Sequence, residues 1–195
     1  MGINRTNSKL LMRSNVKFDG AICQLGRQTI RFSSKQLQKD AKEVNFQLKN
    51  STVFSRGLEC NEDYFRTLGF ENVSSIDISS DVNPTYILDL GKEQNNDLNS
   101  QFDLIFDGGT IEHIFAPEIA LKNIVKMLKV GGSVIHQIPC NNLVEHGFFQ
   151  FSPSFFEKFY EENGCSVSEI LLTCRKHTFM EEYLRSKVYI YDKKE

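Results

Sequence analysis

The sequence predicts an α/β fold in which a doubly wound, mainly parallel sheet is covered by helices on both faces. Strand-like apolar runs alternate with helix-like segments over most of the 195 residues, a pattern typical of parallel sheets joined by crossover helices. In "GAICQLGRQTIRF" (20–32), an apolar run ends at Gly26 and a helical pattern follows. The first strand, turn and helix of a Rossmann-like nucleotide-binding domain have this order.

The strands are expected where apolar residues cluster between turn signals. The predicted ranges, in chain order, are 21–25, 73–79, 85–90, 102–109, 133–139, 166–174 and 186–192. The last two lie close together in sequence, which favours an antiparallel strand near the C-terminus, because parallel neighbours need a crossover of a dozen or more residues. The intervening segment 175–185 is just long enough to leave a parallel arrangement open.

The helices are expected where capping residues precede an apolar face of helical spacing. A short helix or arm is predicted within 1–19. A second helix starts at Ser33 or Ser34 and carries its apolar face to Leu48. The remaining helices are expected from Asn61 as cap to Gly69, from Pro117 to the pair Gly131 and Gly132, and from Ser152 as cap to Gly164.

Composition indicates one soluble globular domain over 1–195. Hydrophobic residues make up 40 % and charged residues 25 %, and the formal net charge of -2 gives no broad attraction for nucleic acid. No apolar run approaches the ~20 residues of a membrane span. The first residues lack the apolar centre of a secretory signal, so a cytoplasmic protein is expected.

The five cysteines predict neither disulfides nor a metal site. They are odd in number, widely scattered and without a Cys-x-x-Cys pair. Reduced cysteines, mostly buried, are therefore expected.

Polar residues follow the predicted strands at the edge where such folds bind ligands. Gly26, Arg27 and Gln28 follow the first strand, and an aspartate lies at or near the end of each of the next three, at Asp77, Asp89 and Asp107. An acid after the second strand can accept both hydroxyls of a ribose. The spacing therefore favours an adenosine-containing ligand.

The single glycine of the first turn narrows the choice of cofactor. A dinucleotide needs a glycine-rich turn for its pyrophosphate, and the sequence has neither that motif nor a P-loop. An adenosine with an amino-acid tail carries no phosphate and needs close backbone approach at one point only. S-adenosylmethionine fits this description.

The motifs resemble those of class I S-adenosylmethionine-dependent methyltransferases over roughly residues 20–165. The resemblance is strongest in "FDLIFDGGTIEHIFAPEIALKNIVKMLKVGGSVIHQIP" (102–139), where a Glu-His turn and a Leu-Lys-x-Gly-Gly ending flank a helix. "LGRQ" (25–28) and "HGFFQFSP" (146–153) are similar to motifs of a subgroup of small bacterial methyltransferases associated with surface-sugar gene clusters.

The resemblance implies a seven-stranded methyltransferase-type sheet and a set of cofactor contacts. Asp77 would bind the ribose, Asp89 would lie on the adenine side, and Asp107 would lie near the methionine end. The implied cofactor-binding residues are Leu25, Gly26, Arg27, Gln28, Asp77, Ile78, Asp89, Leu90, Asp107, Gly108 and Gly109. The acceptor is expected to be a small molecule or a saccharide.

Three residues are candidates for removing the acceptor's proton. His146 follows the fifth strand beside Gly147, and Glu112 and His113 follow the fourth. A histidine has an ordinary pKa close to neutral pH, as a general base requires. A structural role is an equal alternative for Glu112 and His113, and His136 is expected to be packed or at the surface.

Two other functions stay open on the sequence. A first turn with one glycine also suits a methyltransferase-like partner or scaffold protein without activity. A dinucleotide oxidoreductase is disfavoured by the missing Gly-x-Gly-x-x-Gly motif.

Overall fold

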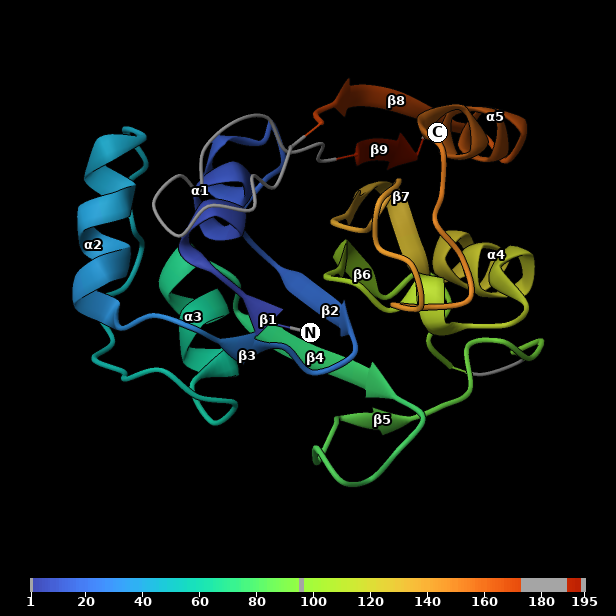
Figure 1. The fold of residues 1–195 in the computed structure, drawn as a ribbon. Helices are drawn as coiled ribbons and strands as arrows, with labels where there is room; N and C mark the ends of the chain where they lie inside the picture. Colours follow the sequence, from blue (N-terminus) through green and yellow to red (C-terminus); the bar gives the residue numbers. More distant parts are fainter. Residues whose placement is uncertain (1, 95–96, 173–188, 194–195) are drawn as a thin grey trace.

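A mainly parallel sheet forms the centre of the molecule, as the sequence predicts (Figure 1). The computed structural model describes residues 2–94, 97–172 and 189–193. The sheet order is β5-β4-β2-β6-β7-β9-β8. Its five parallel strands are β2 (Ala21–Leu25), β4 (Asn72–Asp77), β5 (Tyr86–Ile87), β6 (Phe102–Asp107) and β7 (Leu128–His136).

The C-terminal edge of the sheet is antiparallel. β9 (Tyr189–Lys193) lies between β7 and β8 (Cys165–Ile170) and runs antiparallel to both. Its register pairs Ser133 with Asp192 and His136 with Tyr189. The segment 175–185, on which the predicted connection depends, lies outside the described residues.

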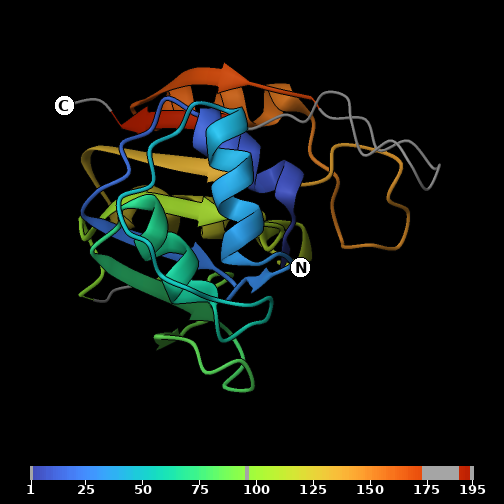
Figure 2. The same ribbon diagram turned by 90° about the vertical axis from the view of Figure 1, so that its left-hand side faces the viewer.

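Helices cover both faces of the sheet (Figures 1 and 2). One face carries α1 (Arg5–Arg13), α2 (Ser34–Glu43) and α3 (Asn61–Leu68). The other carries α4 (Pro117–Met127) and α5 (Pro153–Glu162). Among the described residues, no helix has both the length and the apolar character of a membrane span.

Alternate strand residues divide between the two apolar layers. In β2, Ile22 packs with α1 to α3, whereas Cys23 and Leu25 pack with α4 and α5. In β6, Leu104 and Phe106 pack with α1 to α3 and Ile105 packs with α4 and α5, because successive side chains of a strand point to opposite faces. Burial on both faces accounts for the nearly continuous apolar runs from which the strands were predicted.

Several predicted boundaries differ from the structure. α2 ends at Glu43 instead of reaching Leu48, because Asn45 takes a left-handed conformation with φ of 57°. β5 has two residues where a strand over 85–90 was expected. β7 begins at Leu128, and its register with β6 shifts across Gly131 and Gly132, so these glycines lie in an irregular strand instead of closing α4.

The N-terminal segment forms a small second sheet that the sequence did not predict. β1 (Gly2–Ile3) pairs in parallel with β3 (Thr29–Ile30), a strand just after the first turn. A further bridge joins Ile30 to Gly57. These strands are too short for a periodic pattern to reveal.

Candidate functional site

The strand order places a topological switch point between β2 and β6. From β2 the chain continues to β4 and β5 on one side, and then to β6 and β7 on the other. The register aligns Leu25 with both Ile76 and Asp107, and Asp107 with His136. The residues after these positions therefore share one edge, which is where open α/β sheets bind ligands.

Gly26 forms the first turn at this edge, where both its backbone conformation and its surroundings require glycine. Its φ of 70° lies in the left-handed region, and its N–H donates to the Ile76 carbonyl over 2.8 Å. A Cβ built on Gly26 would lie 2.8 Å from Thr110 Oγ1 and 3.9 Å from Asp77 Oδ2. A side chain here would press against the Thr110 hydroxyl, so glycine is needed where the turn passes between Thr110 and Asp77.

Asp77, the last residue of β4, has an oxygen available at the same place. Its Oδ1 accepts a hydrogen bond from the Ser79 N–H over 3.1 Å. Among the described residues, no hydrogen bond reaches Oδ2, the oxygen that faces Gly26. The next residue, Ile78, has 69 % of its surface exposed and offers an apolar patch beside the carboxylate.

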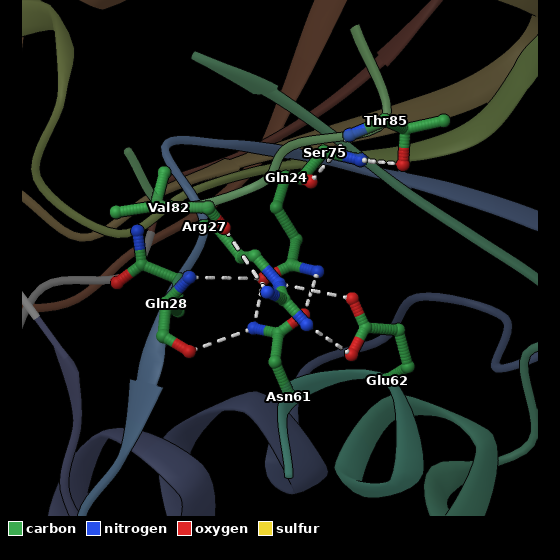
Figure 3. A network of polar contacts seen from close by, with 8 residues as sticks. All are labelled: Gln24, Arg27, Gln28, Asn61, Glu62, Ser75, Val82 and Thr85. Atoms are coloured by element: carbon green, nitrogen blue, oxygen red, sulfur yellow. Dashed lines mark hydrogen bonds and ion pairs between the residues drawn. The ribbon is translucent and has the colours of Figure 1, made fainter. Parts of the chain in front are cut away.

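Arg27 ties the first turn to α3 (Figure 3). Its guanidinium donates to both carboxylate oxygens of Glu62, over 3.0 and 2.9 Å, and to the Val82 carbonyl over 3.0 Å. Three of its five N–H donors are thereby used. Glu62 was not among the predicted site residues, although its position in the first turn of an expected helix was visible.

Gln28 folds back over the turn. Its Nε2 donates to the carbonyls of Leu25 and Gly26, and its buried Oε1 has no hydrogen-bond partner among the described residues. A Cβ on Gly108 would lie 2.7 Å from that Oε1. Gly108 therefore gives the amide room, and an acceptor atom remains unused at the turn.

A buried amide pair supports the turn from below (Figure 3). Asn61 donates to Gln24 Oε1 and to the Gln28 carbonyl, and Gln24 Nε2 donates to Asn61 Oδ1 over 2.6 Å. Asn61 is not the helix cap that the sequence predicts, because Cys60 occupies that position. Its side chain holds the first turn instead.

Asp89 and Leu90 lie just beyond the short β5. Asp89 accepts from the Gly91 N–H over 3.0 Å and lies 3.3 Å from Lys92 Nζ. The Leu90 side chain packs into the apolar layer with α4, and its carbonyl accepts a hydrogen bond from Asn123 Nδ2 over 3.0 Å.

Asp107 is fully buried and its carboxylate is fully engaged. Oδ1 accepts from the N–H groups of Gly109 and Thr110, and Oδ2 lies 2.7 Å from His136 Nδ1. His136 Nε2 in turn lies 2.7 Å from the Tyr160 hydroxyl. Asp107 thus fixes the turn that carries Gly108 and Gly109, and His136 is a packed residue, one of its two predicted environments.

The three predicted catalytic residues come together beyond this turn. Glu112 and His113 lie on the 3₁₀ turn η1 (Ile111–His113), and His146 comes from the loop after β7. Glu112 Oε1 lies 3.8 Å from His113 Nε2 and 3.6 Å from His146 Nε2. The two imidazole rings meet edge to face at 5.0 Å.

We call Glu112, His113 and His146 the Glu112 cluster. Burial shifts the pKa values of two of its members, Glu112 and His113. Burial, together with the nearby Asp107 charge, raises the pKa of Glu112 to about 8. Partial burial and the neighbouring His146 lower the pKa of His113. Within the described part of the chain, neither Glu112 oxygen has a hydrogen-bond partner. The cluster can hold or move a proton, and its three donor atoms can also ligate a cation. The sequence, judged on its cysteines, had predicted no metal site.

Solved structures share this architecture. The N1-methyltransferase of Burkholderia thailandensis, crystallised with 1,6-didemethyltoxoflavin and S-adenosylhomocysteine, is 11% identical with a TM-score of 0.56, over 98% of this chain and 78% of that one. An S-adenosylmethionine-dependent methyltransferase of Clostridium acetobutylicum is 14% identical with a TM-score of 0.51, over 98% and 90%. The sugar N-methyltransferase KedS8 of Streptoalloteichus is 10% identical with a TM-score of 0.56, over 98% and 87%.

The chain has the fold of S-adenosylmethionine-dependent methyltransferases. No protein-family model matches the sequence, and no curated protein matches it either. The similarity is therefore one of fold alone. At 10–14% sequence identity, a shared fold does not show that corresponding residues have the same roles.

Proposed function

We propose that this protein transfers a methyl group from S-adenosylmethionine to a small-molecule or saccharide acceptor. The observation that supports it best is the meeting of the left-handed Gly26 turn with Asp77, whose Oδ2 is available, at the switch point. This is the edge at which open α/β folds bind ligands. The shared fold of the methyltransferases with known structures supports the same proposal.

The residues present suit S-adenosylmethionine better than a nucleotide with phosphates. Asp77 Oδ2 can accept from ribose hydroxyls, and the exposed Ile78 offers an apolar surface to a flat base. The unused Gln28 Oε1 can accept from the ammonium of an amino-acid tail. Asp107 would act indirectly, by fixing the turn, and Arg27 would hold the turn against α3.

The Glu112 cluster is placed to act on the acceptor. When bound, S-adenosylmethionine supplies an electrophilic methyl group on its sulfonium, and the acceptor's oxygen or nitrogen must be held in line and lose a proton. His113 and His146 are partly exposed and both face the buried Glu112. These residues would orient the acceptor and take up its proton.

Exposed aromatic residues beside the cluster support a ring-shaped acceptor. Phe115 follows His113 by two residues, Phe148 follows His146 by two, and their rings meet edge to face at 5.7 Å. Both are strongly exposed. Exposed apolar patches of this kind commonly mark binding sites, and the "LGRQ" and "HGFFQFSP" motifs point to a saccharide.

Calorimetric titration with S-adenosylhomocysteine tests the proposal. We expect one site on the wild-type protein and a binding free energy weakened by about 1–3 kcal/mol in Asp77→Ala, because charged hydrogen bonds to the ribose are lost. Asp81→Ala removes an exposed acid of the adjacent loop and should bind like wild type. If the wild-type protein binds neither S-adenosylhomocysteine nor S-adenosylmethionine at millimolar concentration, the proposal is wrong. The scaffold alternative then takes its place.

A further inference from the structure

The Glu112 cluster has a second property that methyl transfer does not require. Glu112 is completely buried, and its two oxygens and His146 Nε2 are buried atoms without a hydrogen-bond partner among the described residues. Burying an ionised carboxylate without a partner costs several kcal/mol, so such a group needs a proton or a cation. Both histidines direct Nε2 towards the same oxygen, Oε1, at distances too long for hydrogen bonds.

The fold holds these side chains together firmly. The loop after β7 is fastened to the backbone of Glu112, because the Phe149 N–H donates to the Glu112 carbonyl over 3.1 Å. Gly147 allows this approach, since a Cβ there would lie 2.7 Å from the same carbonyl. His146 is therefore held over Glu112 by backbone contacts on its C-terminal side.

The donor set matches a transition-metal ion. The three ligand atoms all lie within 4.8 Å of one another. Two ligands of a tetrahedral zinc ion, with bonds of roughly 2.0–2.2 Å, lie about 3.4 Å apart, and Glu112 Oε1 lies 3.6 Å from His146 Nε2 and 3.8 Å from His113 Nε2. Side-chain shifts of a few tenths of an ångström would close that difference.

We propose that Glu112, His113 and His146 bind a divalent transition-metal ion. Two imidazoles and one carboxylate suit zinc, iron, manganese or cobalt, whereas calcium and magnesium prefer oxygen ligands. The histidine side of the site is open, because the side chains of His113 and His146 are 45% and 32% exposed. Solvent, or an oxygen of the acceptor, would complete the coordination. The acceptor's part in this rests on the proposed function, whereas metal binding does not.

The test uses tag-free, full-length protein stripped of metal with a chelator and then dialysed. Titration with Co²⁺, followed by visible absorption, and with Zn²⁺, followed by calorimetry, should give one saturable site. Mg²⁺ should bind much more weakly. Glu112→Gln and His146→Ala should each weaken Zn²⁺ binding by 10-fold or more, roughly the effect of disturbing a metal site.

Glu145→Gln is the matched control, because it removes a carboxylate from an exposed neighbour of His146. It should bind Zn²⁺ as wild type does. Glu112→Gln preserves shape and places a neutral amide in the buried position, so it should fold, and circular dichroism checks this. The proposal is overturned if the wild-type protein binds no Zn²⁺ or Co²⁺ at millimolar concentration. It is also overturned if folded Glu112→Gln binds Zn²⁺ unchanged, since the metal would then lie elsewhere.

Titration with S-adenosylhomocysteine on the same samples separates the two proposals. Metal binding without cofactor binding would contradict the proposed function and leave the metal site standing. Cofactor binding without metal binding would contradict the proposed metal site and leave the proposed function standing. The cluster would then act through a proton alone.

Discussion

At the scale of single residues, the proposed cofactor binding depends most on Gly26. Its backbone is left-handed, and a side chain would press against Thr110 and lie close to Asp77. The one-glycine turn, which in the sequence favoured either a phosphate-free cofactor or a scaffold protein, therefore still provides close approach. What the sequence could not show is that Thr110, far along the chain, closes the other side.

Gly26→Ala should abolish binding of S-adenosylhomocysteine and lower stability. The left-handed conformation costs an alanine about 1–2 kcal/mol, and contact with Thr110 adds to this. Gly131→Ala is the matched control, because Gly131 has φ of 77° and nothing within 4 Å of a built Cβ. Gly131→Ala should lower the free energy of unfolding by the cost of the left-handed backbone alone, as measured by chemical denaturation. It should bind S-adenosylhomocysteine as the wild type does, as measured by calorimetry. Equal binding by both variants would contradict the role given to Gly26.

His146→Ala should leave the affinity for S-adenosylhomocysteine nearly unchanged and lower turnover by roughly 100-fold, the usual contribution of a positioned acid–base group. The reason is its place in the Glu112 cluster, beyond the turn that faces Asp77. His113→Ala is expected to affect binding as well, because His113 lies on the turn that directly follows the Thr110 contact. Once an acceptor is known, turnover assays check both. Full turnover by His146→Ala would show that His146 only holds its loop.

At the scale of elements, the charged side chain of Asp103 joins three strands at the end of the sheet opposite the candidate site. Asp103 of β6 accepts from the Ala21 N–H over 2.8 Å and from Lys129 Nζ over 2.7 Å, which joins the starts of β2, β6 and β7. Burial alone would raise the pKa of Asp103, but these two donors outweigh it and lower the pKa below its ordinary value. The charged form therefore stabilises the folded state above pH ~4, and this contribution is lost as pH falls through the lowered pKa.

Asp103→Asn should reduce the free energy of unfolding at pH 7 by about 1–2 kcal/mol, a value discounted for a side chain that is one-third exposed. The difference from wild type should shrink as pH falls below 4, because the wild-type carboxylate is then protonated. Urea denaturation between pH 3 and 7 measures this. Asp81→Asn, an exposed acid in a loop, serves as control. A difference that stays constant with pH would show that the charge contributes nothing.

Element boundaries show where sequence patterns fail. Gly69 ends α3 as predicted, because a glycine at φ of 134° stops a helix locally. The shortness of β5 was not predictable, since it depends on pairing with β4. The end of α2 at Glu43 does have a local signal, because asparagine, here Asn45, is a residue type that tolerates the left-handed conformation after a helix. Asn61 has a side chain suited to capping a helix, but this side chain is hydrogen-bonded to the buried Gln24 instead.

At the scale of the whole molecule, the sequence was sufficient for the architecture and for the prediction that the candidate residues share one edge of the sheet. Alternating apolar runs predicted the parallel sheet, and parallel strands bring their carboxyl ends to one edge. The sequence could not show which of the predicted aspartates have carboxylate oxygens available to a ligand. Asp77 and Asp107 look alike in sequence, yet one keeps an available oxygen and the other is consumed by His136 and the backbone of its own turn. Only packing distinguishes them.

The crystal structure of the protein with S-adenosylhomocysteine tests the central claim most directly. We expect the ribose hydroxyls on Asp77, the base beside Ile78, and the amino-acid tail over Gly26 within reach of Gln28, with the sulfur directed towards the Glu112 cluster. A ligand bound away from the carboxyl ends of β2, β4 and β6 would contradict the account. So would a ribose without contact to Asp77.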